Sequence, residues 1–80
     1  MTLNKRPVEQ MLIIIRERAD EKWPALYQQR EYTQLMDILA KPTEEITYAE
    51  KVSVGDALRL FCLCLGLDYY RLLMRVHGMH

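Results

Sequence analysis

The sequence predicts an all-α fold, a compact bundle of four to five short helices around a central apolar helix at about residues 54–65. Three observations support this prediction. Residues 57–67 read ALRLFCLCLGL, and Arg59 is the only charged residue among them. Two further segments carry apolar residues at helical spacing, and proline or glycine stands where such segments end. A helix that is apolar on every side is typical of the centre of a fold, so we expect a single helical domain over residues 1–80.

The N-terminal segment predicts the first helix. Pro7 suits a first turn, where its missing N–H is no loss, and Asn4 is a candidate N-terminal cap. The expected inner face recurs at helical spacing and consists of Val8, Met11, Leu12, Ile15 and Ala19. Ile13 and Ile14 widen this stripe beyond what one neighbouring helix covers. Pro24 interrupts the pattern because its ring presses on the carbonyl group four residues earlier, so either the helix kinks or a new helix begins there.

Residues 25–42, ALYQQREYTQLMDILAKP, resemble the joint between the two helices of a tetratricopeptide repeat, with Ala25, Tyr27 and Tyr32 near their usual places. The resemblance covers one joint, and Arg30 stands where such repeats favour glycine. Because one repeat cannot form a solenoid, the resemblance implies only a local way of packing two helices. The second helix should end before Pro42. Its expected inner face consists of Tyr32, Leu35, Met36 and Leu39.

Residues 43–54 allow two interpretations. Thr43 is a candidate N-terminal cap, and Glu44 and Glu45 would lie in a first turn that favours negative charge, so we expect a short helix at about residues 43–51. The run ITYAEKVSV also alternates well enough to form a short hairpin of two strands. The pattern leaves both interpretations open.

The central and last helices have recognisable ends. Ser53 and Asp56 form a variant capping box, which predicts the start of the central helix, and Gly66 can end it in the left-handed conformation. The side chains expected at the centre of the fold are Leu58, Leu60, Phe61, Leu63, Cys64 and Leu65. Asp68 then caps a final helix. Its expected inner face consists of Tyr69, Leu72, Leu73 and Val76.

The composition limits the possible functions. Eleven basic and eleven acidic residues cancel, so no global field draws the chain toward nucleic acid or an anionic membrane. The longest charge-free run, residues 60–67, is far short of the roughly 20 residues that a membrane span needs. No signal peptide is apparent. Cys62 and Cys64 lie two residues apart on one helix, so they point in different directions and cannot bridge one another. Such cysteines are typical of a reducing compartment, so we expect a cytoplasmic protein with no membrane partner.

No motif predicts catalysis. The three glycines are isolated, so none belongs to a phosphate-binding loop, and both histidines fall in residues 77–80. The cysteines and histidines match no common spacing for a metal site. We therefore expect a protein that is not an enzyme, with no catalytic residues, no metal and no cofactor.

One segment has functional content. Residues 56–78, DALRLFCLCLGLDYYRLLMRVHG, resemble the helix-turn-helix of DNA-binding regulators, with the turn at residues 65–67 and Asp68 as the cap of the second helix. The resemblance implies a DNA-binding transcriptional regulator that uses residues 54–77 and reads DNA with Tyr69, Tyr70, Arg71 and Arg75.

The same segment supports a second interpretation, which we prefer. Tyr70 and Met74 lie four residues apart and form a second stripe on the last helix, flanked by Arg71 and Arg75, which is a composition typical of protein interfaces. Half of the residues are apolar, more than so small an interior should hold. We therefore expect a small regulatory protein that binds an unidentified protein partner through these four residues. We also expect a homodimer that uses Ile13 and Ile14 of the first helix.

Overall fold

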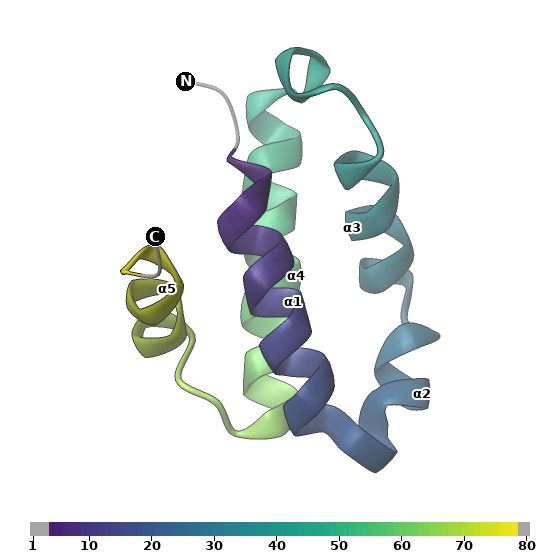
Figure 1. Ribbon diagram of the computed structural model, residues 1–80. Coiled ribbons are helices and arrows are strands. Elements are labelled where there is room, and N and C mark those ends of the chain that lie inside the picture. Colours follow the sequence, from purple (N-terminus) through teal and green to yellow (C-terminus); the bar gives the residue numbers. More distant parts are fainter. Residues whose placement is uncertain (1–3, 79–80) are drawn as a thin grey trace.

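A computed structural model describes residues 4–78 of the chain (Figure 1). This part of the chain is helical and contains no strand, so the predicted all-α fold is confirmed. Its helices are α1 (Lys5–Ala19), α2 (Trp23–Tyr27), α3 (Arg30–Leu39), α4 (Tyr48–Leu65) and α5 (Tyr69–His77), and it also has two short 3₁₀ turns, η1 (Asp20–Lys22) and η2 (Thr43–Glu45). None of the helices within residues 4–78 combines the length and the apolar character that crossing a membrane requires.

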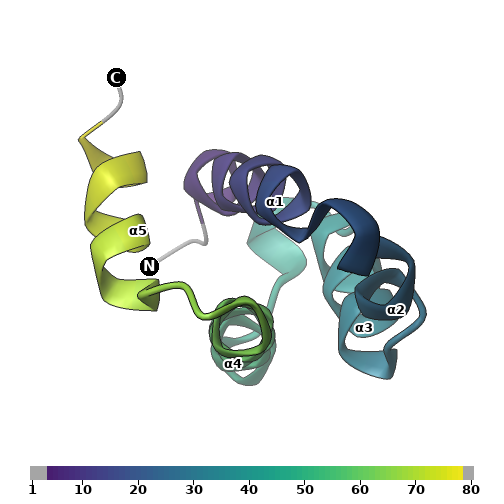
Figure 2. The same ribbon diagram turned by 90° about the horizontal axis from the view of Figure 1, so that it is seen from below.

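Helix α4 lies at the centre of the arrangement, because it packs against α1, α3 and α5. Helices α1 and α4 run side by side in the same direction, whereas α3 and α5 run the opposite way (Figure 1). Viewed along α4, α1 covers one side of it, and α3 and α5 flank the pair at opposite ends (Figure 2). The molecule is flat, with extents of 35 × 29 × 16 Å. Within residues 4–78, no helix therefore covers the side of α4 that faces away from α1.

The core forms between these helices. Helix α1 buries the inner face predicted for it, with Val8, Met11, Ile15 and Ala19 buried and Leu12 partly buried. Phe61 of α4 has no exposed surface and lies beside Tyr32 of α3, with ring centroids 6.3 Å apart. The predicted inner face of α5 is also confirmed, since Leu72 and Val76 are buried and Tyr69 and Leu73 are half-buried against the core.

The first two helix boundaries follow from backbone geometry. Asn4 caps α1 as predicted, because its side-chain oxygen accepts the N–H of Arg6 at 3.1 Å. Helix α1 ends before Asp20, whose φ of 44° breaks the helical path. Of the two outcomes expected at Pro24, a new helix is the correct one, since the proline lies in the first turn of α2. Ala25 and Tyr27 of the joint between α2 and α3 are exposed, and Tyr32 packs edge-on to Trp23 at 5.4 Å.

The predicted start of the central helix was wrong. Helix α4 begins at Tyr48 rather than near residue 54, because Thr47 and Glu50 form a full capping box six residues before the predicted one. The Glu50 N–H donates to Thr47 Oγ1 at 3.2 Å, and the Thr47 N–H donates to Glu50 Oε1 at 3.0 Å. Ser53 is not a cap, since its hydroxyl donates to the Ala49 carbonyl inside the helix at 3.1 Å.

Neither interpretation of residues 43–54 was correct in full. Thr43–Glu45 forms only a single 3₁₀ turn, and the following residues belong to α4 instead of a separate short helix. The hairpin is excluded because residues 43–54 contain no strand. Ile46 is buried between the turn and α4, which anchors this connection to the core.

The end of α4 agrees with the prediction. Gly66 has a φ of 70°, and its N–H donates to the Leu63 carbonyl at 3.2 Å while the Leu67 N–H donates to the Cys62 carbonyl at 2.8 Å. This pair of bonds is the Schellman motif, which satisfies two carbonyl groups at the helix end. Asp68 caps α5 by accepting the N–H of Arg71 at 3.2 Å. The turn between α4 and α5 is therefore tightly defined.

Some side chains expected in the core lie elsewhere. Leu63 is 77% exposed and Cys64 is also exposed, whereas Leu60 and Leu65 are only half-buried. The physical reason is that α1, α3 and α5 leave one side of α4 open. On α3, Ile38 is buried and Met36 is largely outside the core, so the inner face is rotated from the one predicted.

Candidate interaction surface

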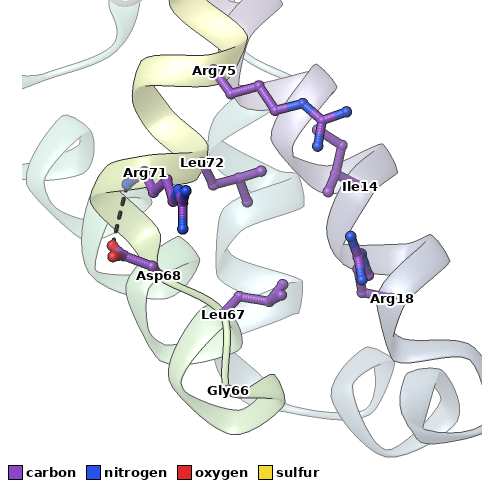
Figure 3. Close-up of a pocket in the computed structure, with 8 residues that line it drawn as sticks. All are labelled: Ile14, Arg18, Gly66, Leu67, Asp68, Arg71, Leu72 and Arg75. Atoms are coloured by element: carbon purple, nitrogen blue, oxygen red, sulfur yellow. Dashed lines mark hydrogen bonds between the residues drawn. The ribbon is translucent and has the colours of Figure 1, made fainter.

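The residues predicted to bind a partner lie on two different flanks of α5. Tyr70 and Met74 lie one turn apart on its outer side, with 61% and 75% of their surfaces exposed. Arg71 and Arg75 lie one turn apart on the flank that faces α1 (Figure 3). The prediction treated these four residues as one site. The structure divides them into an apolar surface and a basic one.

The apolar surface continues from α5 onto α4. Val52, Arg59 and Leu63 are exposed and share one side of α4, because their spacing of seven and four residues returns to the same side of a helix. We call the surface formed by Val52, Arg59, Leu63, Tyr70 and Met74 the outer α4–α5 face. Val52, Leu63, Tyr70 and Met74 are all exposed, and the contact of Arg59 with Tyr70 links the residues of α4 to those of α5.

Arg59 connects the two helices on this face. Its guanidinium carbon lies 5.6 Å from the centroid of the Tyr70 ring and 5.9 Å from that of Tyr69. The two tyrosine rings are themselves edge to face at 5.3 Å. Contacts of a cation with aromatic faces at these distances are attractive. Sequence reasoning did not assign Arg59 to the site; the available signal was a single charge in an otherwise apolar stretch.

Tyr69 has a different role from Tyr70. It is half-buried and packs against the core, and burial raises the pKa of its phenol. Of the residues that the helix-turn-helix resemblance assigns to DNA, Tyr70, Arg71 and Arg75 are exposed, whereas Tyr69 faces largely inward.

The basic surface is a groove between α1 and α5 with a volume of about 520 Å³. We call it the α1–α5 groove. Arg71 and Arg75 reach into it from α5, and Arg18 borders it from α1 (Figure 3). Its remaining lining consists of Ile14, Gly66, Leu67, Asp68 and Leu72. Arg18 was not predicted as a site residue, because it is far from α5 in the sequence and only the fold brings it there.

The charges in the groove are unbalanced. Within residues 4–78, the only side-chain ion pair joins Lys41 to Glu50 at 2.6 Å, so Arg18, Arg71 and Arg75 have no acidic partner in contact. Asp68 is the one acidic residue in the lining, and its carboxylate accepts the backbone N–H of Arg71. The groove therefore carries an excess of positive charge in a chain that is neutral as a whole.

The two isoleucines predicted for a homodimer also separate. Ile13 is 58% exposed on α1, whereas Ile14 is half-buried and lines the α1–α5 groove. Ile13 is thus the isoleucine available to another molecule, and Ile14 forms part of the apolar wall beneath the arginines.

The two cysteines have different surroundings. Cys62 is buried, and this burial raises the pKa of its thiol, whereas Cys64 is exposed. Within the described residues, no three side chains of histidine, cysteine, aspartate or glutamate form a group able to hold a metal ion.

Comparisons with protein-family models, with curated proteins and with solved structures found no match to this chain.

Proposed function

We propose that this protein is a small non-catalytic regulator that binds a protein partner through the outer α4–α5 face. The observation that carries the proposal is the exposure of Leu63 in the last turn of α4, within the most apolar stretch of the sequence. Its own fold leaves this side chain in water, although the rest of α4 forms the centre of the core. If another protein covered Leu63, binding would gain the free energy of burying this side chain, which folding of the single chain does not gain.

The composition of the face supports this proposal. Burying a leucine or methionine side chain contributes roughly 1.5–3 kcal/mol, and Leu63 and Met74 are both mostly exposed. Tyrosine and arginine are enriched among the residues that dominate binding energy, and here Arg59 and Tyr70 are already held against one another. Less side-chain freedom then remains to be lost when a partner binds.

Self-association is part of the proposal. Ile13 on α1 and the outer α4–α5 face are separate apolar surfaces, and both remain exposed in a single copy. We expect a homodimer at micromolar concentration, and sedimentation equilibrium measures it directly. A single monomeric species at these concentrations would contradict this part of the proposal. A cytoplasmic location also belongs to the proposal and is supported by two free cysteines.

Affinity capture with matched variants tests partner binding. Leu63→Glu places a charge on the outer α4–α5 face, and Met36→Glu places the same charge on an exposed site of α3. Glutamate is compatible with both helices. We expect the wild type and Met36→Glu to capture the same partner protein, and Leu63→Glu to lose it. Equal capture by all three proteins would contradict the proposal.

DNA binding is the second candidate. It is supported by Arg71 and Arg75, which lie exposed on the helix that follows the Gly66 turn and have no acidic partner in contact among residues 4–78. Phosphate contacts release counterions, so binding to DNA would weaken steeply as salt is added. Electrophoretic titration against mixed duplex DNA at low salt tests this candidate. Micromolar binding that Arg71→Ala weakens would favour it over the partner-protein proposal.

A further inference from the structure

We propose that the α1–α5 groove binds a small anionic ligand that carries two or more phosphate or carboxylate groups. The inference concerns a different surface from the outer α4–α5 face and requires neither Tyr70 nor Met74. It rests on three features of the groove: arginines from two helices, the absence of acidic partners in contact with them among the described residues, and a concave shape with an apolar wall.

The arginines surround one space. Arg71 and Arg75 lie one turn apart on α5, and Arg18 comes from the facing side of α1 (Figure 3). Guanidinium groups bind carboxylate and phosphate through paired N–H donors, so each of them can contact a separate oxygen group of one ligand. A ligand with several anionic groups can therefore bridge the two helices, which a single chloride ion cannot do.

The arginines of the groove are not neutralised by ion pairs within residues 4–78. None of the three arginines has a carboxylate within 4.0 Å in the part of the chain described by the structure. Asp68 offsets one charge, and its carboxylate is already used to cap α5. Placing three arginines beside one aspartate brings like charges together, and a bound polyanion would relieve this repulsion.

The shape favours a small ligand over a duplex. A volume of about 520 Å³ lies within the range of about 300–1,000 Å³ that is usual for small-molecule sites. Ile14, Leu67 and Leu72 provide an apolar wall that suits the carbon skeleton of such a ligand. A recognition helix that reads DNA projects as a ridge into the major groove, whereas these arginines border a hollow between two helices.

A titration followed by two-dimensional ¹H–¹⁵N NMR tests this inference with the full chain. The probes are inorganic pyrophosphate, for the phosphate class, and citrate, for the carboxylate class, in a buffer of low ionic strength. Saturable shifts of the amides of Ile14, Leu67 and Leu72 are expected with at least one probe. The spectra also show whether each variant is folded, so loss of binding is separated from loss of structure.

The variants locate the effect. The double variant Arg71→Gln/Arg75→Gln should bind the probe about tenfold or more weakly than the wild type, since each change removes charged hydrogen bonds. Arg18→Gln alone should weaken it severalfold. Arg16→Gln is the matched control, because it removes the same charge from α1 at a residue that packs over Trp23, 5.6 Å from the ring centroid, and is not part of the groove lining. The affinity of Arg16→Gln for the probe should stay within about twofold of that of the wild type, since screened charges at a distance contribute little.

Three results would overturn the inference. The first is that neither pyrophosphate nor citrate causes saturable shifts at millimolar concentration. The second is that Arg16→Gln weakens binding as much as the variants of the groove arginines do. The third is that duplex DNA shifts the amides of Ile14, Leu67 and Leu72 while pyrophosphate and citrate do not. Each is independent of whether Leu63→Glu abolishes capture of a partner protein.

Discussion

The guanidinium group of Arg59 lies over the ring of Tyr70, with its central carbon 5.6 Å from the ring centroid. This contact joins α4 to α5. It fixes the relative position of the two helices where the tight turn at Gly66 already restricts them. Arg59 and Tyr70 of the outer α4–α5 face are therefore already in contact within a single chain.

Replacing Arg59 with glutamine should destabilise the fold modestly. The change removes two cation–aromatic contacts at an exposed site, for which about 0.5–1 kcal/mol is typical. Urea unfolding followed by circular dichroism measures the difference. Arg30→Gln, in the first turn of α3, is the control and should not destabilise, because a positive charge is unfavourable at that end of a helix. An Arg59→Gln variant as stable as the wild type would show that the contacts with Tyr69 and Tyr70 do not stabilise the fold.

Two residues of α4 that are separated by a single position should respond very differently to truncation. Phe61→Ala removes a side chain with no exposed surface, so we expect a loss of about 3–5 kcal/mol. Leu63→Ala should change the free energy of unfolding by less than about 0.5 kcal/mol, because that side chain is already in water. Chemical denaturation of both variants measures the contrast. Similar losses would mean that α4 is covered on both sides.

The capping box of α4 should make stability depend on pH in the acid range. The pKa of Glu50 is lowered from 4.5 to about 2, first because Lys41 donates to its carboxylate and then because the Thr47 N–H does so. Since the folded pKa is below the unfolded one, this stabilisation is complete above about pH 4.5 and is lost as the pH falls toward about 2.

Thermal unfolding at a series of pH values tests this expectation. Glu50→Gln replaces the carboxylate with an amide that does not titrate. The decline in thermal stability between pH 4.5 and about 2 should therefore be smaller than in the wild type. Glu44→Gln, at an exposed site of η2, is the matched control and should follow the wild type. An unchanged pH profile in Glu50→Gln would show that the titration of Glu50 is not linked to folding.

The thiols should react at two distinct rates. Cys64 is exposed, whereas Cys62 is buried and has a raised pKa, so a thiol reagent should modify Cys64 quickly and Cys62 only when the protein opens. Ellman's reagent measures both phases. Cys64→Ser should lack the fast phase while Cys62→Ser keeps it. A fast phase that survives in Cys64→Ser would contradict the burial of Cys62.

Much of the fold could be predicted from the sequence because short-range signals define it. Asn4, Gly66 and Asp68 each act on residues within one or two turns, and each has the expected role. The inner faces of α1 and α5 follow from helical spacing alone. The start of α4 could not be chosen in this way, because Thr47–Glu50 and Ser53–Asp56 both look like caps and only the first pair is also held by Lys41.

The candidate site depends on relations that the sequence pattern does not contain. An apolar stretch indicates burial but does not say which of its sides lacks a neighbour, so Leu63 was expected in the core. Arg18 meets Arg71 and Arg75 only because α1 and α5 pack together. Tyr70 and Met74 were identified correctly as an exposed stripe, since their spacing relative to Leu72 and Val76 places them outside.

Site-specific photocrosslinking in cells tests partner binding through the outer α4–α5 face most directly. A photoreactive phenylalanine analogue is placed at position 63 in one variant and at position 36, on α3, in the other. The mass of an adduct distinguishes a second 9.5 kDa copy of the chain from another protein. We predict a discrete protein adduct from position 63 and none from position 36. An absence of adducts at position 63, or the same adducts from both positions, would contradict the account.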